Sequence, residues 1–223
     1  NSDGSITSSV SANTTAGFSI VAYTSPGTSA DGTVGHGLSQ APELVITKNR
    51  DAITHWDSWV SGLSSTYSLL LNSSDPQLSN RWSATIPSAS LVTVRDAYEV
   101  NGTDKYIAYC FHSVEGYSKV GSYEGNANAD GTFVYTGFQP AYLLTKSIDG
   151  TYNWYQTDNK STPINVRDNV LYPDLSAAHG SSWPWVDFLS NGFKLRTSSS
   201  GVNNNTFIYL AFAESPFKYS NAR

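Results

Sequence analysis

The chain has 223 residues, a formal net charge of −5 and only 14% charged residues, so clustered lysines and arginines of the kind that hold duplex nucleic acid are not expected. Its 13% aromatic content gives too much apolar surface for a disordered chain, and its length allows a core without disulfide or metal staples. No apolar run approaches the roughly 18 residues of a membrane helix, so we expect no membrane insertion.

Residues 1–16 are predicted to contain an extended strand that precedes the rest of the fold. Polar and small apolar residues alternate here, which places Ile6, Val10 and Ala12 on one face. A lone strand leaves its amide groups unpaired in water and needs a partner. The segment can be an edge strand of its own sheet, a disordered end, a partner of an upstream domain, or a strand donated to a neighbouring subunit. In the last case Ile6, Val10 and Ala12 are the candidate interface residues.

Short runs rich in β-branched and aromatic residues recur along the chain and predict strands. The clearest runs are 18–23, 43–48, 142–146, 191–197 and 207–212. Asp-Gly and Asn-Gly pairs, which favour turns, bound many of these runs. No stretch shows a sustained helical period, although 69–71 is ambiguous. We therefore predict an all-β fold, either a sandwich or a barrel.

The sequence repeats itself with an offset of about 100 residues. Ordered matches pair residues 17–19 with 116–118, 30–33 with 129–132, 44–48 with 142–146, 56 with 154, and 106–111 with 207–212. A repeat of this length is domain-sized, and the short junction at 112–116 favours two halves that pack together. We predict an N-terminal extension strand at 1–16, a first β repeat unit at 17–115 and a second at 116–223.

We find no set of residues that predicts a reaction, a metal centre or a cofactor. The four histidines and one cysteine are widely scattered and show no spacing typical of zinc ligands. No glycine-rich phosphate loop occurs in the sequence. Residues 126–131 alternate oxygen donors as half a calcium loop would, but Gly137 stands where that loop needs a glutamate. An ordinary turn is the preferred interpretation. Cys110 lies in an apolar run and is expected to be a small buried residue.

Two tryptophans around a proline form the one site-like feature, within the polar stretch 181–187. Trp183 and Trp185 can stack on sugar rings or anchor a receptor. Large aromatic side chains more often pack in a core, which is the alternative for this pair. Trp56 and Trp154 recur at equivalent places in the two copies, and this recurrence favours a core role for them.

The stretch from Tyr106 to Trp154, which includes YSKVGSYEGNANADGTFVYTGFQPAYLLTKS, resembles an uncharacterised domain family in structural proteins of tailed bacteriophages, mainly from aquatic samples. The opening DGSITSSVSANTTAGFSIV and the closing YLAFAESPFKYSNAR resemble the same family, so the likeness covers essentially the whole chain. The resemblance implies a component of a virion-surface tail fibre or fibril and supplies no catalytic residues. A bacterial fibril protein could share the domain equally well.

We therefore expect a non-enzymatic structural subunit of an extracellular or virion-surface fibre, which binds copies of itself through β-strand contacts, with donation of the N-terminal strand as one route. The alternative is a tail-fibre module that binds a cell-surface glycan or receptor, with Trp183 and Trp185 as candidate contacts. A jelly-roll-like hydrolase is a third hypothesis, and it requires paired acids along one concave face. No cofactor is expected.

Overall fold

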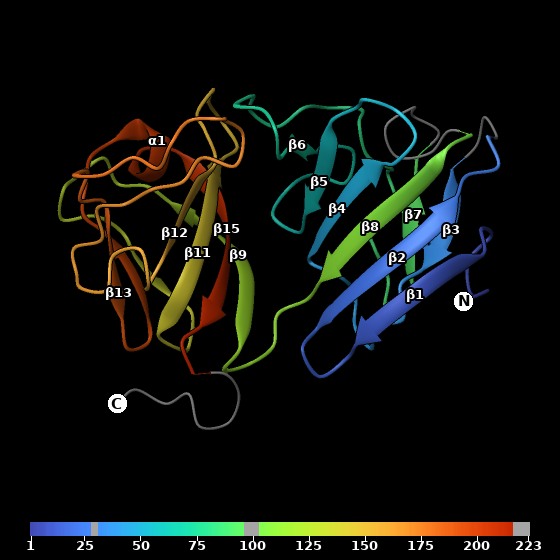
Figure 1. Ribbon diagram of the computed structural model, residues 1–223, viewed down its shortest axis with the longest axis horizontal. Helices are drawn as coiled ribbons and strands as arrows, with labels where there is room; N and C mark the ends of the chain where they lie inside the picture. The colour runs from blue at the N-terminus through green and yellow to red at the C-terminus, as the bar shows by residue number, and fades with distance from the viewer. Residues whose placement is uncertain (28–30, 96–102, 216–223) are drawn as a thin grey trace. The chain divides into compact units, whose positions relative to one another are not determined.

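A computed structural model describes residues 1–27, 31–95 and 103–215 and shows an almost entirely β-stranded chain (Figure 1). The described ranges hold strands β1 to β15 and one four-residue helix, α1 (Ser200–Asn203). The prediction of an all-β fold is thereby confirmed, with antiparallel sheets packed face to face.

The chain divides into two compact units. Unit 1 comprises Asn1–Leu71 and Gln77–Ser113, and unit 2 comprises Asn72–Pro76 and Val114–Arg223. The first 16 residues therefore lie inside unit 1, and a short piece from the first half of the sequence belongs to unit 2. One contact that ties this short piece to unit 2 is a hydrogen bond of 3.3 Å, which the Nζ of Lys146 donates to the carbonyl of Ser74.

Unit 1 has a large antiparallel sheet and a two-stranded sheet. The large sheet runs in the order β1 (Ser8–Asn13), β2 (Phe18–Thr24), β8 (Lys105–Phe111), β4 (Leu44–Asn49), β5 (Trp56–Val60) and β6 (Leu69–Leu70). Figure 1 shows the first five of these strands side by side. The small sheet pairs β3 (Gly32–Gly35) with β7 (Leu91–Val94).

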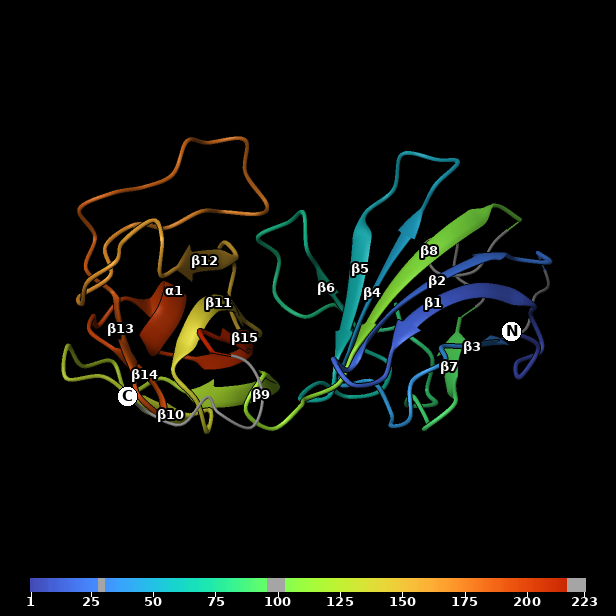
Figure 2. The ribbon, with the colours of Figure 1, turned by 60° about the horizontal axis from the view of Figure 1, so that its bottom comes forward.

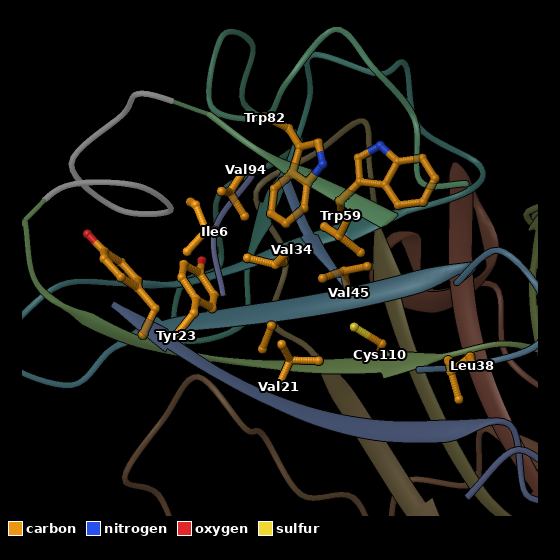
Figure 3. Close-up of a cluster of buried hydrophobic side chains, with 13 residues drawn as sticks. Ile6, Val21, Tyr23, Val34, Leu38, Val45, Trp59, Trp82, Val94 and Cys110 are labelled. Carbon is orange, nitrogen blue, oxygen red and sulfur yellow. The ribbon is translucent and has the colours of Figure 1, made fainter. Parts of the chain in front are cut away.

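The core of unit 1 lies between these two sheets (Figure 3). Val21, Val45 and Cys110 come from the large sheet, Val34 and Val94 from the small one, and each is at most 1% exposed. Burying such aliphatic side chains contributes about 1.5–3 kcal/mol each. The burial of Cys110 confirms the prediction of a small buried residue, and this burial also raises the pKa of its thiol to about 12.

Unit 2 has a four-stranded sheet and a three-stranded sheet (Figure 2). The first runs in the order β12 (Tyr155–Asp158), β11 (Pro140–Ser147), β15 (Thr206–Ala213) and β9 (Ser118–Glu124). The second runs in the order β10 (Phe133–Tyr135), β14 (Gly192–Leu195) and β13 (Val186–Leu189). Its core is rich in aromatic rings, and Tyr123 stacks on Phe207 with ring centroids 4.9 Å apart.

The two units follow the same topology. In unit 1 the strands β2, β8, β4 and β5 lie in the sheet order that β9, β15, β11 and β12 follow in unit 2, and the pair β3·β7 corresponds to β10·β14. This correspondence is what a tandem duplication requires, and the duplication itself stays an inference from the sequence matches. The ambiguous run 69–71 contributes the short strand β6. Of the recurring tryptophans, Trp154 is buried and Trp56 is half-buried.

Candidate functional site

The N-terminal strand β1 pairs with β2 of its own chain along its whole length. The antiparallel register runs from Ser8 opposite Tyr23 to Asn13 opposite Phe18. The alternation expected from the sequence is present, since Ser8 is buried while Ser9 and Ser11 are exposed. This pairing is the intramolecular alternative named above, so β1 is an edge strand of unit 1.

Ile6, just ahead of β1, is a core residue of its own unit. Its side chain is 6% exposed, and its N–H donates a hydrogen bond of 2.9 Å to the carbonyl of Thr33. A parallel bridge to Val34 ties it to the small sheet, while β1 belongs to the large one. The segment thus joins both sheets. In this arrangement Ile6 offers no apolar face to a neighbour, because its own core already covers that face.

The outer side of β1 is an open sheet edge. Ser8 exchanges main-chain hydrogen bonds of 3.0 and 2.7 Å with Asn1, so its main chain points away from β2. Main-chain groups alternate between the two sides of a strand, and those of Val10 and Ala12 therefore point outward as well. Val10 packs its side chain against the core, whereas Ala12 is exposed. Among the described residues, no further strand pairs with β1 on this side.

In unit 2, no strand within the described residues pairs with β10 on the side away from β14, and this side is the second open edge. Thr132 accepts a hydrogen bond of 3.0 Å from Leu195, and Thr136 donates one of 3.0 Å to Asn191. By the same alternation, the main-chain N–H and C=O groups of Val134 point toward β14, while those of Phe133 and Tyr135 point to the open side. Their side chains are 44% and 60% exposed. Unpaired edges with exposed aromatic residues are prone to pair with another chain.

The ring of Tyr135 is held in place at that edge. Lys119 of β9 lies over it, with Nζ 5.4 Å from the ring centroid, and also donates a hydrogen bond of 3.2 Å to the Tyr135 carbonyl. A cation over an aromatic face contributes about 0.5–1 kcal/mol at exposed sites. The exposed aromatic side chain is therefore ordered before any partner arrives.

The two candidate tryptophans differ in depth. Trp185 is 0% exposed and belongs to the core of unit 2, whereas Trp183 is half-buried. Their rings stack at 5.9 Å and 10°, and Tyr155 packs 5.5 Å from Trp183. Trp185 cannot touch a ligand in this fold, because protein atoms cover its entire surface. Of the two predicted contact residues, only Trp183 retains accessible ring surface.

The connection between β12 and β13, residues 159–185, is the longest exposed loop of unit 2 (Figure 2). Isolated bridges pair Leu171 with Gln156 and Val170 with Gly180, so the loop has a defined path. Four large apolar side chains on this connection are exposed: Ile164 at 73%, Val166 at 37%, Leu171 at 42% and Leu175 at 47%. Loops of this length without strands of their own are usually functional.

A pocket of about 270 Å³ lies between β12 and this connection. Its lining consists of Gln156, Thr157, Asp158, Ser161, Asn169, Val170, Leu171 and His179. Most of these side chains are polar and uncharged, and no residue of this pocket belonged to the sequence prediction. A stretch without periodicity gives no signal of which polar residues will converge, so pattern reasoning could not have found it.

A wider groove of about 560 Å³ lies in unit 1 beside the start of β1. Its lining includes hydroxyl residues of the N-terminal segment and two cations, Arg50 and Lys105. Asp51 lies close by, since its Oδ2 accepts a hydrogen bond of 2.9 Å from the Lys105 main chain. Opposite charges thus adjoin each other here, and the groove has no single sign of charge.

The turn at 126–131 is held by the protein itself. The Asn126 side chain accepts a hydrogen bond of 3.0 Å from the Asn128 main chain and one of 3.0 Å from Asn203 Nδ2. Asp130 forms an ion pair of 2.9 Å with Lys194, which lowers the pKa of its carboxyl. Within the described ranges, no three His, Cys, Asp or Glu side chains gather closely enough to hold a metal ion.

Comparison with known protein families assigns the chain to one family. Residues 1–216 match the family described as a domain of unknown function (DUF7483). The chain belongs to this family. No curated protein and no solved structure matches it. Among the helical segments that the structure describes, none has the length and apolar character to cross a lipid bilayer.

Proposed function

We propose that this DUF7483 domain is a non-enzymatic structural subunit of an extracellular or virion-surface fibre, and that it associates with copies of itself through open sheet edges. The observation that carries the proposal is the β10 edge. There the main-chain groups of Phe133 and Tyr135 point away from β14, the Tyr135 carbonyl is engaged only by the Lys119 side chain among the described residues, and both aromatic side chains are exposed. Pairing at a sheet edge gains affinity from main-chain hydrogen bonds and register from side chains.

The β1 edge supplies the complementary strand for such a contact. It lies in unit 1, while β10 lies in unit 2, so β1 of one copy pairing with β10 of another copy joins two different surfaces. A contact between different surfaces propagates into a filament unless its rotation closes a ring. Edge pairing replaces strand donation as the assembly route, because the N-terminal segment already completes its own unit.

Two substitutions test the edges without disturbing the fold. Ala12→Pro removes an outward N–H from β1, at an exposed position where an edge strand tolerates proline. Phe133→Glu places a carboxylate opposite Lys194, its cross-strand partner on β14, and removes the exposed ring from β10. We expect the unmodified chain to sediment as multimers and to form filaments in electron micrographs, and both variants to sediment as monomers.

Leu175→Glu is the matched control, because Leu175 is as exposed as Phe133 but lies far from either edge strand in the sequence. It should assemble like the unmodified chain. The proposal is wrong if the unmodified chain remains monomeric at every concentration tested, or if both edge variants assemble normally.

The second candidate is a module that binds a glycan or receptor. The exposed connection 159–185 favours it, since that loop combines Trp183, four exposed apolar side chains and a polar pocket within one unit. A glycan array with Trp183→Ala is the direct test. Unchanged binding in that variant would remove Trp183 as a contact residue.

A further inference from the structure

We propose that the pocket between β12 and the 159–185 connection binds a neutral sugar residue. This inference rests on the second candidate function and does not depend on assembly. It specifies the ligand class and assigns the main polar contacts with the ligand to residues of the pocket, which neither Trp183 nor Trp185 lines. The residues that would recognise the sugar are Gln156, Asp158, Asn169 and His179, with Leu171 as the apolar contact.

The polar walls of the pocket are fixed by bonds within the protein. Asp158 Oδ1 accepts hydrogen bonds of 2.7 and 2.8 Å from the main chains of Lys160 and Ser161. Asn169 Nδ2 donates a bond of 2.7 Å to the Ser161 carbonyl. Gln156 Oε1 accepts a bond of 3.2 Å from the Tyr142 hydroxyl. Each side chain is therefore held in one orientation before a ligand arrives, which reduces the entropy lost on binding.

Each of these side chains keeps one hydrogen-bonding group that no described residue engages. The groups are Asp158 Oδ2, Asn169 Oδ1 and Gln156 Nε2, together with the imidazole of the exposed His179. They offer two strong acceptors, an amide donor and a ring that can serve as either. Neighbouring hydroxyl groups of a sugar both donate and accept, and this mixture of donors and acceptors matches them.

The pocket favours an uncharged ligand of small size. Asp158 brings the one carboxylate of the lining, and no lysine or arginine lines the pocket to attract an anion. A volume of about 270 Å³ lies just below the range of about 300–1,000 Å³ for drug-sized ligands, which suits one ring and not a long chain. Leu171, at 42% exposure, adds an apolar surface for the C–H face of that ring.

The experiment uses the full chain and four probes: D-glucose, D-galactose, D-mannose and N-acetyl-D-glucosamine. We would titrate each probe and follow the NMR signals of the His179 imidazole and of the leucine methyl groups. We expect saturable shifts at His179 and Leu171 with at least one probe, and a dissociation constant at least about fivefold larger in His179→Ala, the loss expected for one hydrogen bond. His179 is exposed, so this variant should fold normally.

Leu171→Ala and Leu175→Ala form the matched pair, since both leucines are exposed on the same connection but only Leu171 lines the pocket. Leu171→Ala should weaken binding and Leu175→Ala should not. The proposal is overturned if no probe shifts His179 at concentrations up to ~50 mM, where the remaining binding energy would be under about 2 kcal/mol. Equal affinities in His179→Ala and the unmodified chain would overturn it too. An assembly defect would leave these titrations unchanged, so the two proposals fail separately.

Discussion

Units 1 and 2 share one topology but complete it in different ways. In unit 1 the chain start joins both sheets through Ile6 and β1, and a buried ion pair between Asp57 and Arg81 fastens the region after β5. Unit 2 has an open aromatic edge at β10 and a long connection with exposed leucines. The common sheets therefore provide stability in both units, and the candidate contacts with other molecules lie mainly on unit 2.

The largest expected difference between the units concerns their ion pairs. Asp57 and Asp187 are both buried. Arg81 contacts both oxygens of Asp57 at 3.0 Å and its side chain is 19% exposed, whereas the side chain of Arg196, which pairs with Asp187, is 36% exposed. Removing one partner of a buried pair leaves a charge without compensation. We expect Arg81→Met to lower the free energy of unfolding of unit 1 by about 3–5 kcal/mol. Arg196→Met should lower that of unit 2 by less, because Arg196 is more exposed than Arg81 and its pair is better solvated, although Asp187 is itself buried.

Hydrogen exchange measured separately for peptides of each unit distinguishes the two effects. Burial already raises the pKa of Asp57, while Arg81 opposes that rise, so the loss in Arg81→Met should shrink in acid, where Asp57 takes up a proton. Equal losses in both variants would show that burial of the pair does not determine its contribution.

The next largest effect tests whether the chain start belongs to the core of unit 1. Ile6→Ala removes a buried side chain from the core of unit 1, and such truncations lower the free energy of unfolding by about 2–5 kcal/mol. Ser9→Ala, at an exposed position on the other face of the strand, should change it by less than about 0.5 kcal/mol. Urea unfolding measures both. A loss in Ile6→Ala no larger than that in Ser9→Ala would show that β1 and Ile6 do not complete the unit.

The strands were predictable because their signal is local. The runs that gave β2, β4, β11, β14 and β15 combine β-branched and aromatic residues with turn residues at their ends. The alternation in residues 6–12 likewise predicted which side chains share a face. It could not show what covers that face, because the partner, Val34 on β3, lies in a distant part of the sequence.

The candidate site was less predictable than the fold. Trp183 and Trp185 are two residues apart and their rings stack together, so no pattern distinguishes the half-buried ring from the buried one. The pocket depends on where the 159–185 connection crosses β12, which is fixed by isolated bridges such as that between Gln156 and Leu171. Such bridges leave no periodic trace in a sequence.

A smaller effect compares two equivalent lysines. Lys48 of unit 1 and Lys146 of unit 2 each donate a hydrogen bond to the carbonyl of the next residue, at 2.8 and 2.9 Å. Lys48 is half-buried, but Lys146 is 0% exposed, and this burial lowers the pKa of Lys146 to about 8. Above pH 8 the folded chain therefore releases this proton before the unfolded chain does, and stability rises with pH until the unfolded lysine also titrates.

We expect the stability difference between the unmodified chain and Lys146→Met to change by about 1.5 kcal/mol from pH 8 to 9.5. Urea unfolding midpoints at several pH values measure it. Taking the difference between variants removes the opposing contribution of Cys110, whose raised pKa makes folding less favourable once the unfolded thiol ionises. A pH-independent difference for Lys146→Met would contradict the burial argument.

The smallest expected effect lies on the acid side and should be confined to unit 1. His36 is 0% exposed, its Nδ1 accepts a hydrogen bond of 3.2 Å from Leu38, and its Nε2 donates one of 3.1 Å to the Ser88 carbonyl. Burial lowers the pKa of His36, and nearby His112 acts in the same direction, while Ser88 and Asp3 oppose it. At a pH below the ordinary pKa of histidine, the His36 imidazole binds a proton in the unfolded chain but stays neutral in the folded chain until the pH reaches its lowered pKa. The stability present above about pH 6.5 is therefore lost as the pH falls, by at most about 1.4 kcal/mol per pH unit for one proton.

His36→Gln should reduce this loss of stability in acid, measured by hydrogen exchange in peptides of unit 1. It should leave unit 2 unaffected, because unit 2 has Tyr135 and Thr136 at the equivalent place. A slope that persists in the variant would assign the acid sensitivity to the carboxyl groups instead.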